Sequence, residues 1–232
     1  MKIALLGYGR MGKTIEKLAV ERGHSVVKKI DQGDTYDFAD ADVAIDFSVP
    51  DAAVDNISMA LKSCVPVVSG TTGWLDRYPE MVALCKESNG AFIYASNFSV
   101  GVNIFFELNK KLAQMMKALD SYNVSMTEVH HIHKLDAPSG TAITLAEGII
   151  EESSKTDWIL DNEESDKITI KAVREAEVPG THTITYQSDV DEIMIEHKAH
   201  SRNGFALGAI IAAEWLKDKK GVHTMKDVLN LS

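Results

Sequence analysis

The sequence predicts an α/β protein in which a parallel-sheet domain is joined to a second, α+β domain whose sheet is mixed and largely open. Three observations favour this fold class. Short apolar strands alternate with amphipathic helices through the first 100 residues, strand-like alternation dominates after residue 120, and an apolar helix follows at 205–216. We therefore expect one domain over residues 1–100, completed by residues 205–232, and a second over residues 101–204.

The first domain is expected to alternate strand and helix from its amino end. The predicted strands span residues 2–6, 25–30, 42–47, 65–69 and 91–95, and the predicted helices span 13–22, 51–62 and 76–88. Ile15, Leu18 and Ala19 supply the helical spacing of the first helix, and Gly23 stands where a C-terminal cap belongs. This order predicts a parallel sheet covered by helices on both faces.

The second domain is expected to begin with a long helix and to continue mainly as strands. We predict helices at 102–119 and 141–150, and strands at 123–131, 168–174, 183–187 and 192–199, the last two as a hairpin. In the first of these strands Val124, Met126, Glu128 and His130 share one face, because side chains alternate along a strand. Residues 151–166, rich in Glu, Ser and Asp, are interpreted as a solvated loop.

A glycine-rich turn joins the first strand to the first helix. It matches the pattern G-x-G-x-x-G and consists of Gly7, Tyr8, Gly9, Arg10, Met11 and Gly12. The first glycine permits a tight turn, the second lets the backbone approach a pyrophosphate, and the third lets helix and strand pack closely. Such a motif alone can be a plain structural turn, but its position between strand and helix predicts a Rossmann-type dinucleotide-binding domain.

An acidic residue and two further loops extend this predicted cofactor site. Asp31 follows the second strand, where a carboxylate can hold a ribose hydroxyl. Asp31 favours NADH, whereas Lys29 and Gln32 leave room for NADPH, so the expected cofactor is NADH, NADPH or both. Two later strands end in small or hydroxylated residues that suit a nicotinamide and its ribose, with ordinary turns as the alternative. These are Gly70, Thr71, Thr72, Ala95, Ser96, Asn97 and Phe98.

Three histidines and a lysine crowd into five positions in the middle of the chain, at His130, His131, His133 and Lys134. Histidine exchanges protons near neutral pH, and lysine supplies a positive charge or, where its pKa is lowered, a proton. A zinc site is an alternative, but a separated second group of ligands is missing from the sequence. Solvated surface histidines are a further alternative.

A Pro-Ser-Gly-Thr turn follows these residues and opens a helix. Ser139 is the predicted N-cap, so Gly140 and Thr141 would present helix N-terminal amides to a carboxylate. The neighbouring imidazoles and ammonium therefore predict a site that binds a small carboxylated substrate and moves protons. For an enzyme of this kind, the cofactor bound by the glycine-rich loop and the substrate bound by the basic turn would take part in the same reaction.

Composition excludes several other classes. Of the 232 residues 45% are hydrophobic, and the net charge of −10 argues against a nucleic-acid partner. No apolar run approaches the roughly 20 residues of a membrane helix. The chain starts on a predicted strand, so we expect no secretory signal. Cys64 and Cys85 fit no metal motif, which favours a reducing cytoplasmic location and predicts no bound metal.

The central motif resembles the signature of the dihydrodipicolinate reductase family. It runs Glu128-x-His130-His131-x-x-Lys134-x-Asp136 and continues through Ala142. Further similar segments occur in the same order along the chain: Gly7–Gly12, Gly70–Thr72, Asn97–Asn103, Arg174–Glu175, Pro179–His182, His197–Ala199 and Phe205–Ala209. The glycine loop is one residue shorter than the common family form, Gln32 stands where many members carry Arg, and the chain is shorter near residues 31–42 and 151–166.

The resemblance implies reduction of 4-hydroxy-tetrahydrodipicolinate, a small dicarboxylate, by NADH or NADPH in the diaminopimelate route to lysine. It implies that His130 donates or accepts a proton and that Lys134 is a second proton donor. His131, Gly140 and Thr141 would bind substrate, with Ser139 and Thr72 near it. The resemblance also implies a homotetramer built by the second domain's sheet. A different two-domain dehydrogenase and a non-catalytic NADH sensor are the competing functions.

Overall fold

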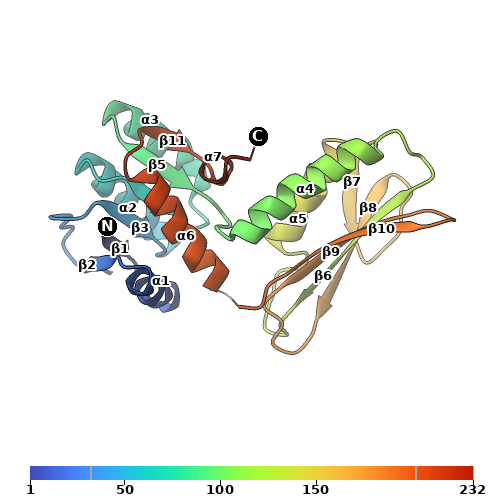
Figure 1. The fold of residues 1–232 in the computed structure, drawn as a ribbon, viewed down its shortest axis with the longest axis horizontal. Coiled ribbons are helices and arrows are strands. Elements are labelled where there is room, and N and C mark those ends of the chain that lie inside the picture. The colour runs from blue at the N-terminus through green and yellow to red at the C-terminus, as the bar shows by residue number, and fades with distance from the viewer. Residues whose placement is uncertain (32, 202, 232) are drawn as a thin grey trace. The chain divides into compact units, whose positions relative to one another are not determined.

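The computed structural model describes residues 1–31, 33–201 and 203–231, and the chain divides into two compact units (Figure 1). Unit 1 comprises Met1–Val100 and Asn203–Ser232, and unit 2 comprises Gly101–Arg202. No helix of the described segments is both long and apolar enough to cross a membrane.

Unit 1 is a six-stranded sheet in which every pairing is parallel. Its strands are β1 (Lys2–Leu6), β2 (Ser25–Ile30), β3 (Val43–Asp46), β4 (Val67–Ser69), β5 (Ala91–Tyr94) and β11 (Gly221–His223), in the order β11-β5-β4-β3-β1-β2. After β1 the chain adds β2 on one side of it, and then adds β3, β4, β5 and β11 in turn on the other side. The strand order therefore reverses between β1 and β3. Ligands of open α/β sheets bind at such a reversal, beyond the carboxyl ends of the strands.

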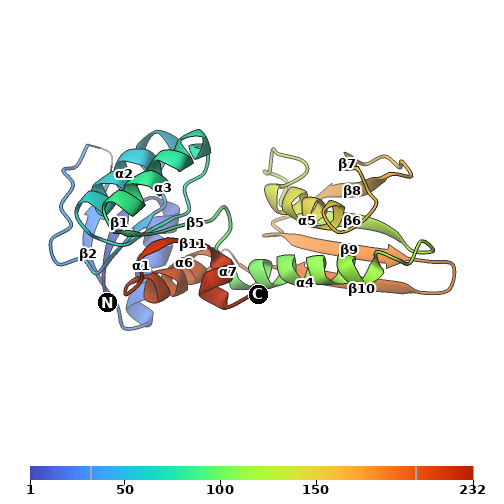
Figure 2. The same ribbon diagram turned by 90° about the horizontal axis from the view of Figure 1, so that it is seen from above.

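Helices cover both faces of this sheet, as predicted (Figure 2). One core joins the sheet to α1 (Arg10–Glu21), α6 (Asn203–Leu216) and α7 (Met225–Leu229), and the other joins it to α2 (Pro50–Lys62) and α3 (Tyr78–Glu87). A short 3-10 turn, Leu75–Arg77, precedes α3. Because both faces are covered, the central strands are buried on both sides: all four residues of β3 are buried.

Unit 2 is a five-stranded mixed sheet with helices on one face. It contains α4 (Val100–Met116), β6 (Asn123–His130), α5 (Gly140–Ile150), β7 (Asp157–Leu160), β8 (Lys167–Arg174), β9 (Thr181–Gln187) and β10 (Glu192–Lys198). The strand order is β10-β9-β6-β8-β7, with β6 parallel to β8 and antiparallel to β9. Burial alternates along β6, so Val124, Met126, Glu128 and His130 do share the inward face.

The structure differs from the expected elements in several places, and the long helix α4 ends at Met116, three residues before the expected end. Residues 151–166 are not all loop, because β7 pairs in parallel with β8 through the apolar run after Asp157. The first helix begins at Arg10, three residues earlier than expected, with Gly9 as its N-cap. The sequence patterns also missed β11 and α7, which have only three and five residues.

Candidate active site

The glycine-rich turn of unit 1 has the geometry that its three glycines predict. Gly7 has φ +87, and a Cβ there would lie 2.4 Å from the carbonyl oxygen of Phe47. A Cβ on Gly12 would lie 2.4 Å from the carbonyl oxygen of Gly7. Gly9, by contrast, has no described neighbour within 4 Å of its Cβ position. The turn thus packs tightly on two sides and leaves Gly9 open to an approaching ligand.

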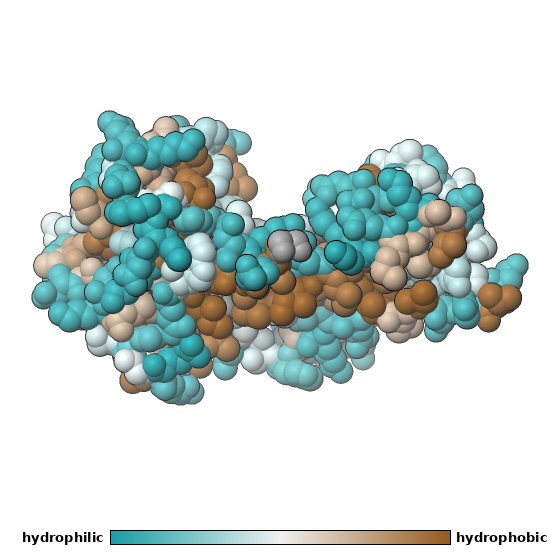
Figure 3. Space-filling model, turned by 45° about the horizontal axis from the view of Figure 1, so that its top comes forward, coloured by the Kyte–Doolittle hydropathy of each residue, from teal (hydrophilic) through white to brown (hydrophobic). Residues whose placement is uncertain are grey.

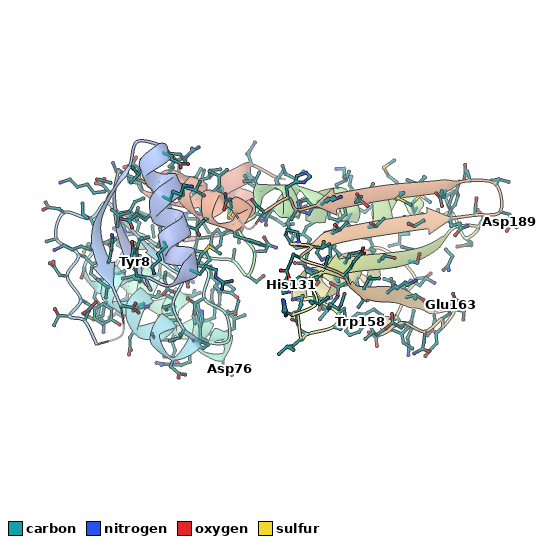
Figure 4. All side chains as sticks on the ribbon, turned by 90° about the horizontal axis from the view of Figure 1, so that it is seen from below. Tyr8, Asp76, His131, Trp158, Glu163 and Asp189 are labelled. Atoms are coloured by element: carbon teal, nitrogen blue, oxygen red, sulfur yellow. The ribbon has the colours of Figure 1, made fainter. Side chains whose placement is uncertain are left out.

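The other residues of this turn are exposed or half-buried. The hydroxyl of Tyr8, which Figure 4 labels, donates to Glu16. The carboxylate of Glu16 also pairs with Lys29 at 2.7 Å. The Lys29 ammonium lies 4.5 Å from the centre of the Tyr8 ring, so it is held by α1 and the loop. Arg10 is exposed at the first position of α1, and Met11 is half-buried behind it.

A cavity of about 540 Å³ opens beside Gly7, at the reversal of strand order. The carboxyl ends of β1 and β2 and the start of α2 line it. Its lining includes four exposed aspartates: Asp31, Asp34, Asp51 and Asp55. Gln32, on which part of the cofactor prediction rests, lies outside the described residues. The cavity has the position and size of an adenosine site, and its described charged groups are acidic.

A buried carboxylate that the sequence patterns missed organises the neighbouring loops. Asp46 ends β3 and is 0% exposed. It accepts hydrogen bonds from Ser48 Oγ at 2.6 Å, Asn56 Nδ2 at 2.8 Å and Ser69 Oγ at 2.7 Å. Burial raises the pKa of Asp46, although these donors oppose the shift. An acidic residue at the end of an otherwise apolar strand is the sequence signal that could have revealed it.

The loop at residues 70–73 is anchored to this network. The amide of Gly70 donates to the carbonyl of Asp46, and a Cβ on Gly70 would lie 2.3 Å from the Phe47 ring. Thr71 is buried and its hydroxyl accepts from the amide of Ser48 at 2.8 Å, so this side chain is engaged within the protein. Thr72, which follows it, is exposed.

The loop after β5 presents a mixed set of side chains. Ser96 is exposed, and Ala95 and Asn97 are half-buried. Phe98 is 1% exposed and belongs to the core of unit 1, where its ring lies 5.8 Å from that of Phe47. Any contact of Phe98 with a cofactor would therefore be made by its backbone rather than by its ring.

In unit 2 the candidate catalytic residues surround a second buried carboxylate. Glu128 lies on the inward face of β6 and is 1% exposed. Its Oε1 accepts from the amide of Ser139 at 3.1 Å and from Arg174 at 3.0 Å, and its Oε2 lies 3.3 Å from Nδ1 of His130. Burial opposes ionisation of Glu128, but these hydrogen bonds outweigh it and hold its pKa at about 2.

His182, from β9, completes this cluster. Its Nε2 lies 3.2 Å from Ser139 Oγ, and its ring centre lies 5.1 Å from that of His130. Burial, together with the adjacent His130, lowers the pKa of His182 to about 4, so this imidazole is neutral at neutral pH. Ser139 also accepts from the amide of Ala142, which confirms it as the N-cap of α5.

Lys134 lies in the turn after β6 and is held through Asp136 and Arg174. Its ammonium donates to both carboxylate oxygens of Asp136, each at 2.8 Å. Arg174 donates to the carbonyl of Lys134 at 3.3 Å and to that of Asp136 at 2.6 Å. Arg174 therefore links this turn to Glu128, and hydrogen bonding to Lys134 lowers the pKa of Asp136.

The remaining predicted substrate residues lie at the same end of the unit 2 sheet. Figure 4 shows His131 just beyond β6, at the end opposite Asp189 in the β9–β10 turn. His131 is half-buried, with its ring centre 6.1 Å from that of the exposed His133. Gly140 is exposed and Thr141 half-exposed in the first turn of α5.

The cluster has spacing that a divalent cation could use. Ligand atoms of Glu128, His130 and His182 all lie within 4.8 Å of one another. However, Glu128 already binds the guanidinium of Arg174 and the amide of Ser139. A cation would add positive charge beside an existing one, so the arrangement fits a hydrogen-bonded network better than a metal centre.

Comparison with family models covers nearly the whole chain. The model described as dihydrodipicolinate reductase, N-terminus, matches residues 1–98, and the model described as dihydrodipicolinate reductase, C-terminus, matches residues 101–229. The chain is 59% identical to the 4-hydroxy-tetrahydrodipicolinate reductase of Christiangramia forsetii, over 99% of this chain and 98% of the relative. It is 37% identical to the reductase of the same name from Methanoculleus marisnigri, over 82% and 76% of the two chains.

Solved structures share the fold at lower sequence identity. The chain is similar to a dipicolinate-bound dihydrodipicolinate reductase from Paenisporosarcina sp. TG-14, with a TM-score of 0.78, 21% identity and coverage of 100% and 99% of the two chains. A probable dehydrogenase from Thermotoga maritima matches with a TM-score of 0.59 at 12% identity, over 98% and 92% of the chains. The fold is thus also found in a solved structure that has another name.

Proposed function

Because the chain belongs to the dihydrodipicolinate reductase family, we propose that it reduces 4-hydroxy-tetrahydrodipicolinate to tetrahydrodipicolinate with NADH or NADPH, in lysine and diaminopimelate biosynthesis. The observation that carries this proposal is the network around Glu128, which holds His130, Ser139 and, through Arg174, Lys134 at one end of the unit 2 sheet. A protein that only bound NADH would not need this arrangement of proton-carrying groups.

The reaction adds one hydride and consumes one proton while the substrate hydroxyl leaves as water. Bound NADH or NADPH supplies the hydride. Lys134 and His130 are suited to exchange the protons, because an ammonium can donate a proton to a leaving hydroxyl and an imidazole can donate or accept one. The glycine-rich turn of unit 1 is the proposed pyrophosphate site, with Gly9 and the start of α1 facing the phosphates.

Two carboxylates on the substrate match the positive groups of unit 2. Asp136 shows that Lys134 can hold a carboxylate by both of its oxygens. A substrate carboxylate would take this position, while the helix N-terminus at Gly140 and Thr141 would receive the other. We assign His131 and Thr72 as further substrate contacts, and the loops 70–72 and 95–98 as contacts of the nicotinamide half of the cofactor.

We propose that NADH is the preferred cofactor. The cavity beside Gly7 contains four aspartates, and Lys29 is already paired with Glu16. A doubly charged 2′-phosphate about 6 Å from one carboxylate in water would be disfavoured by about 1.4 kcal/mol, or about tenfold in binding. The kcat/KM for NADH should therefore exceed that for NADPH by about tenfold or more.

Steady-state kinetics with enzymatically generated substrate test the proposed activity. Lys134→Ala should lower kcat by about 10²-fold, as loss of a general acid does. Lys111→Ala, an exposed lysine of α4, is the matched control and should keep wild-type turnover. Pyridine-2,6-dicarboxylate should inhibit competitively with the substrate. Wild-type protein that binds NADH but does not turn over would refute the proposal and favour a sensor.

We also propose that the chain assembles as a homotetramer through the uncovered face of the unit 2 sheet. The helices α4 and α5 pack on one face only. The other face carries the partly exposed Thr127, Thr183 and Thr185, with Met194 54% exposed beside them. Figure 3 views the helix-covered side of unit 2, where a separate band of hydrophobic residues runs along α4, and it does not show this open face. The number of subunits comes from the family, and light scattering would measure it.

A further inference from the structure

The imidazole of His130 is held on its Nδ1 side by a fixed carboxylate. Oε1 of Glu128 is occupied by Ser139 and Arg174, from two other elements, so the carboxylate cannot rotate freely. Its Oε2 lies 3.3 Å from Nδ1 of His130. Both atoms are buried, and neither has another hydrogen-bonding partner among the described residues. Two buried polar atoms that each need a partner therefore face one another.

The second imidazole near Glu128 is that of His182, which forms a hydrogen bond with another group. Nε2 of His182 lies 3.7 Å from Glu128 Oε2, farther than His130, and only 3.2 Å from the hydroxyl of Ser139. His182 thus shares a hydrogen bond with the N-cap of α5. Oε2 of Glu128 can therefore accept a hydrogen bond from His130.

The opposite edge of the His130 ring lies against a glycine. Gly180 has φ +153, and a Cβ built on it would lie 3.0 Å from Nε2 of His130. Any side chain at this position would push against the imidazole. The His130 side chain keeps 10% of its surface exposed. Glu128 therefore faces the Nδ1 edge of the ring, and the glycine at position 180 keeps the Nε2 edge free of a side chain from that position.

We propose that Glu128 is a positioning residue that fixes the Nδ1–H tautomer of His130, while Gly180 leaves room for Nε2 as the nitrogen that exchanges the proton. A carboxylate only accepts hydrogen bonds, so Nδ1 must carry the hydrogen and Nε2 keeps its lone pair. Serine hydrolases use a buried carboxylate on histidine in the same physical way. This inference rests on the proposed reductase function, because it assigns a role within that reaction.

The substitution Glu128→Gln tests the tautomer directly. The Gln amide oxygen can accept from Ser139 and Arg174, but its NH₂ group then faces Nδ1 of His130 and makes that nitrogen an acceptor. The variant should convert His130 to the Nε2–H tautomer and lower kcat by about 10²-fold or more, with little change in the KM for NADH. Glu147→Gln, an exposed glutamate on α5, is the matched control.

The tautomer is measured by ¹⁵N NMR of histidine-labelled full-length protein, with His130 assigned by loss of its signals in His130→Asn. Nδ1–H in the wild type and Nε2–H in Glu128→Gln is the expected result. Nε2–H in the wild type overturns the proposal without any variant, so poor folding of Glu128→Gln does not prevent the test. The double variant with His130→Asn should be no slower than His130→Asn alone, and additive losses would contradict a role through His130.

The NMR experiment needs no turnover. A wild-type protein without reductase activity would therefore refute the proposed function and still reveal whether Glu128 sets the tautomer.

Discussion

Removal of the buried carboxylate of Asp46 should destabilise unit 1 strongly. In Asp46→Ala, Ser69 at 0% exposure and Asn56 at 5% lose their acceptor in places that water does not reach. Ser48 is partly exposed and can turn to solvent. Each buried donor left unpaired costs about 1–3 kcal/mol, so the free energy of unfolding should fall by about 4 kcal/mol.

Asp46→Asn should be much milder, and this contrast makes the test specific. The amide oxygen can accept from Ser48 and Asn56, while the NH₂ group donates to the hydroxyl of Ser69, which can rotate to accept it. Each of the three side chains then keeps one hydrogen bond to residue 46, and we expect a loss below about 1 kcal/mol at neutral pH. The alanine variant should also raise the KM for cofactor, because the loop at residues 70–73 is anchored to this network.

The difference in stability between Asp46→Asn and the wild type should depend on pH, because the pKa of Asp46 is raised. Burial raises the pKa of this carboxyl in the folded state above its ordinary value of 3.8. Its contribution to stability is therefore full below that value and is lost as pH rises through the folded pKa. The asparagine does not titrate, so its stability relative to the wild type should improve as pH rises from about 4.

Urea unfolding followed by the fluorescence of the buried Trp74, at several pH values, measures both effects. If Asp46→Ala is within about 1 kcal/mol of the wild type, or Asp46→Asn is equally damaging, then the hydrogen bonds do not have the energetic role assigned to them.

Three further outcomes are expected. Gly12→Ala should abolish NADH binding in calorimetry and lower the unfolding temperature, since its Cβ would lie 2.4 Å from the carbonyl oxygen of Gly7; normal affinity would contradict the close packing. The Lys134–Asp136 pair lowers the pKa of Asp136 below its ordinary value of 3.8. Any stability lost in Asp136→Asn at pH 7 should therefore shrink as pH falls through this lowered pKa, and a difference that stays constant into strong acid would refute the pairing. Thr185→Lys should reduce the assembled mass in light scattering, and an unchanged mass would place the subunit interface elsewhere.

Much of the fold could be predicted because its signals are local. Strand β2 spans the residues that its pattern predicts, and the inward face of β6 follows from alternation alone. The region around β7 was misread because its four residues lie among acidic and hydroxylated ones, and only pairing with β8 makes them a strand. Strand β11 was missed for the same reason, since three residues carry no usable period.

The amino-acid sequence by itself determined the dinucleotide turn, the basic histidine-lysine segment and the N-cap at Ser139, because each depends on residues that are neighbours in the chain. Only the tertiary structure decided which groups surround them. Arg174, Gly180 and His182 come from β8, from the start of β9 and from β9, and they meet Glu128 and His130 of β6 through the pairing of β6 with β8 and β9. Hydrogen bonds between distant residues form only when strand register brings them together, and no local pattern records that register.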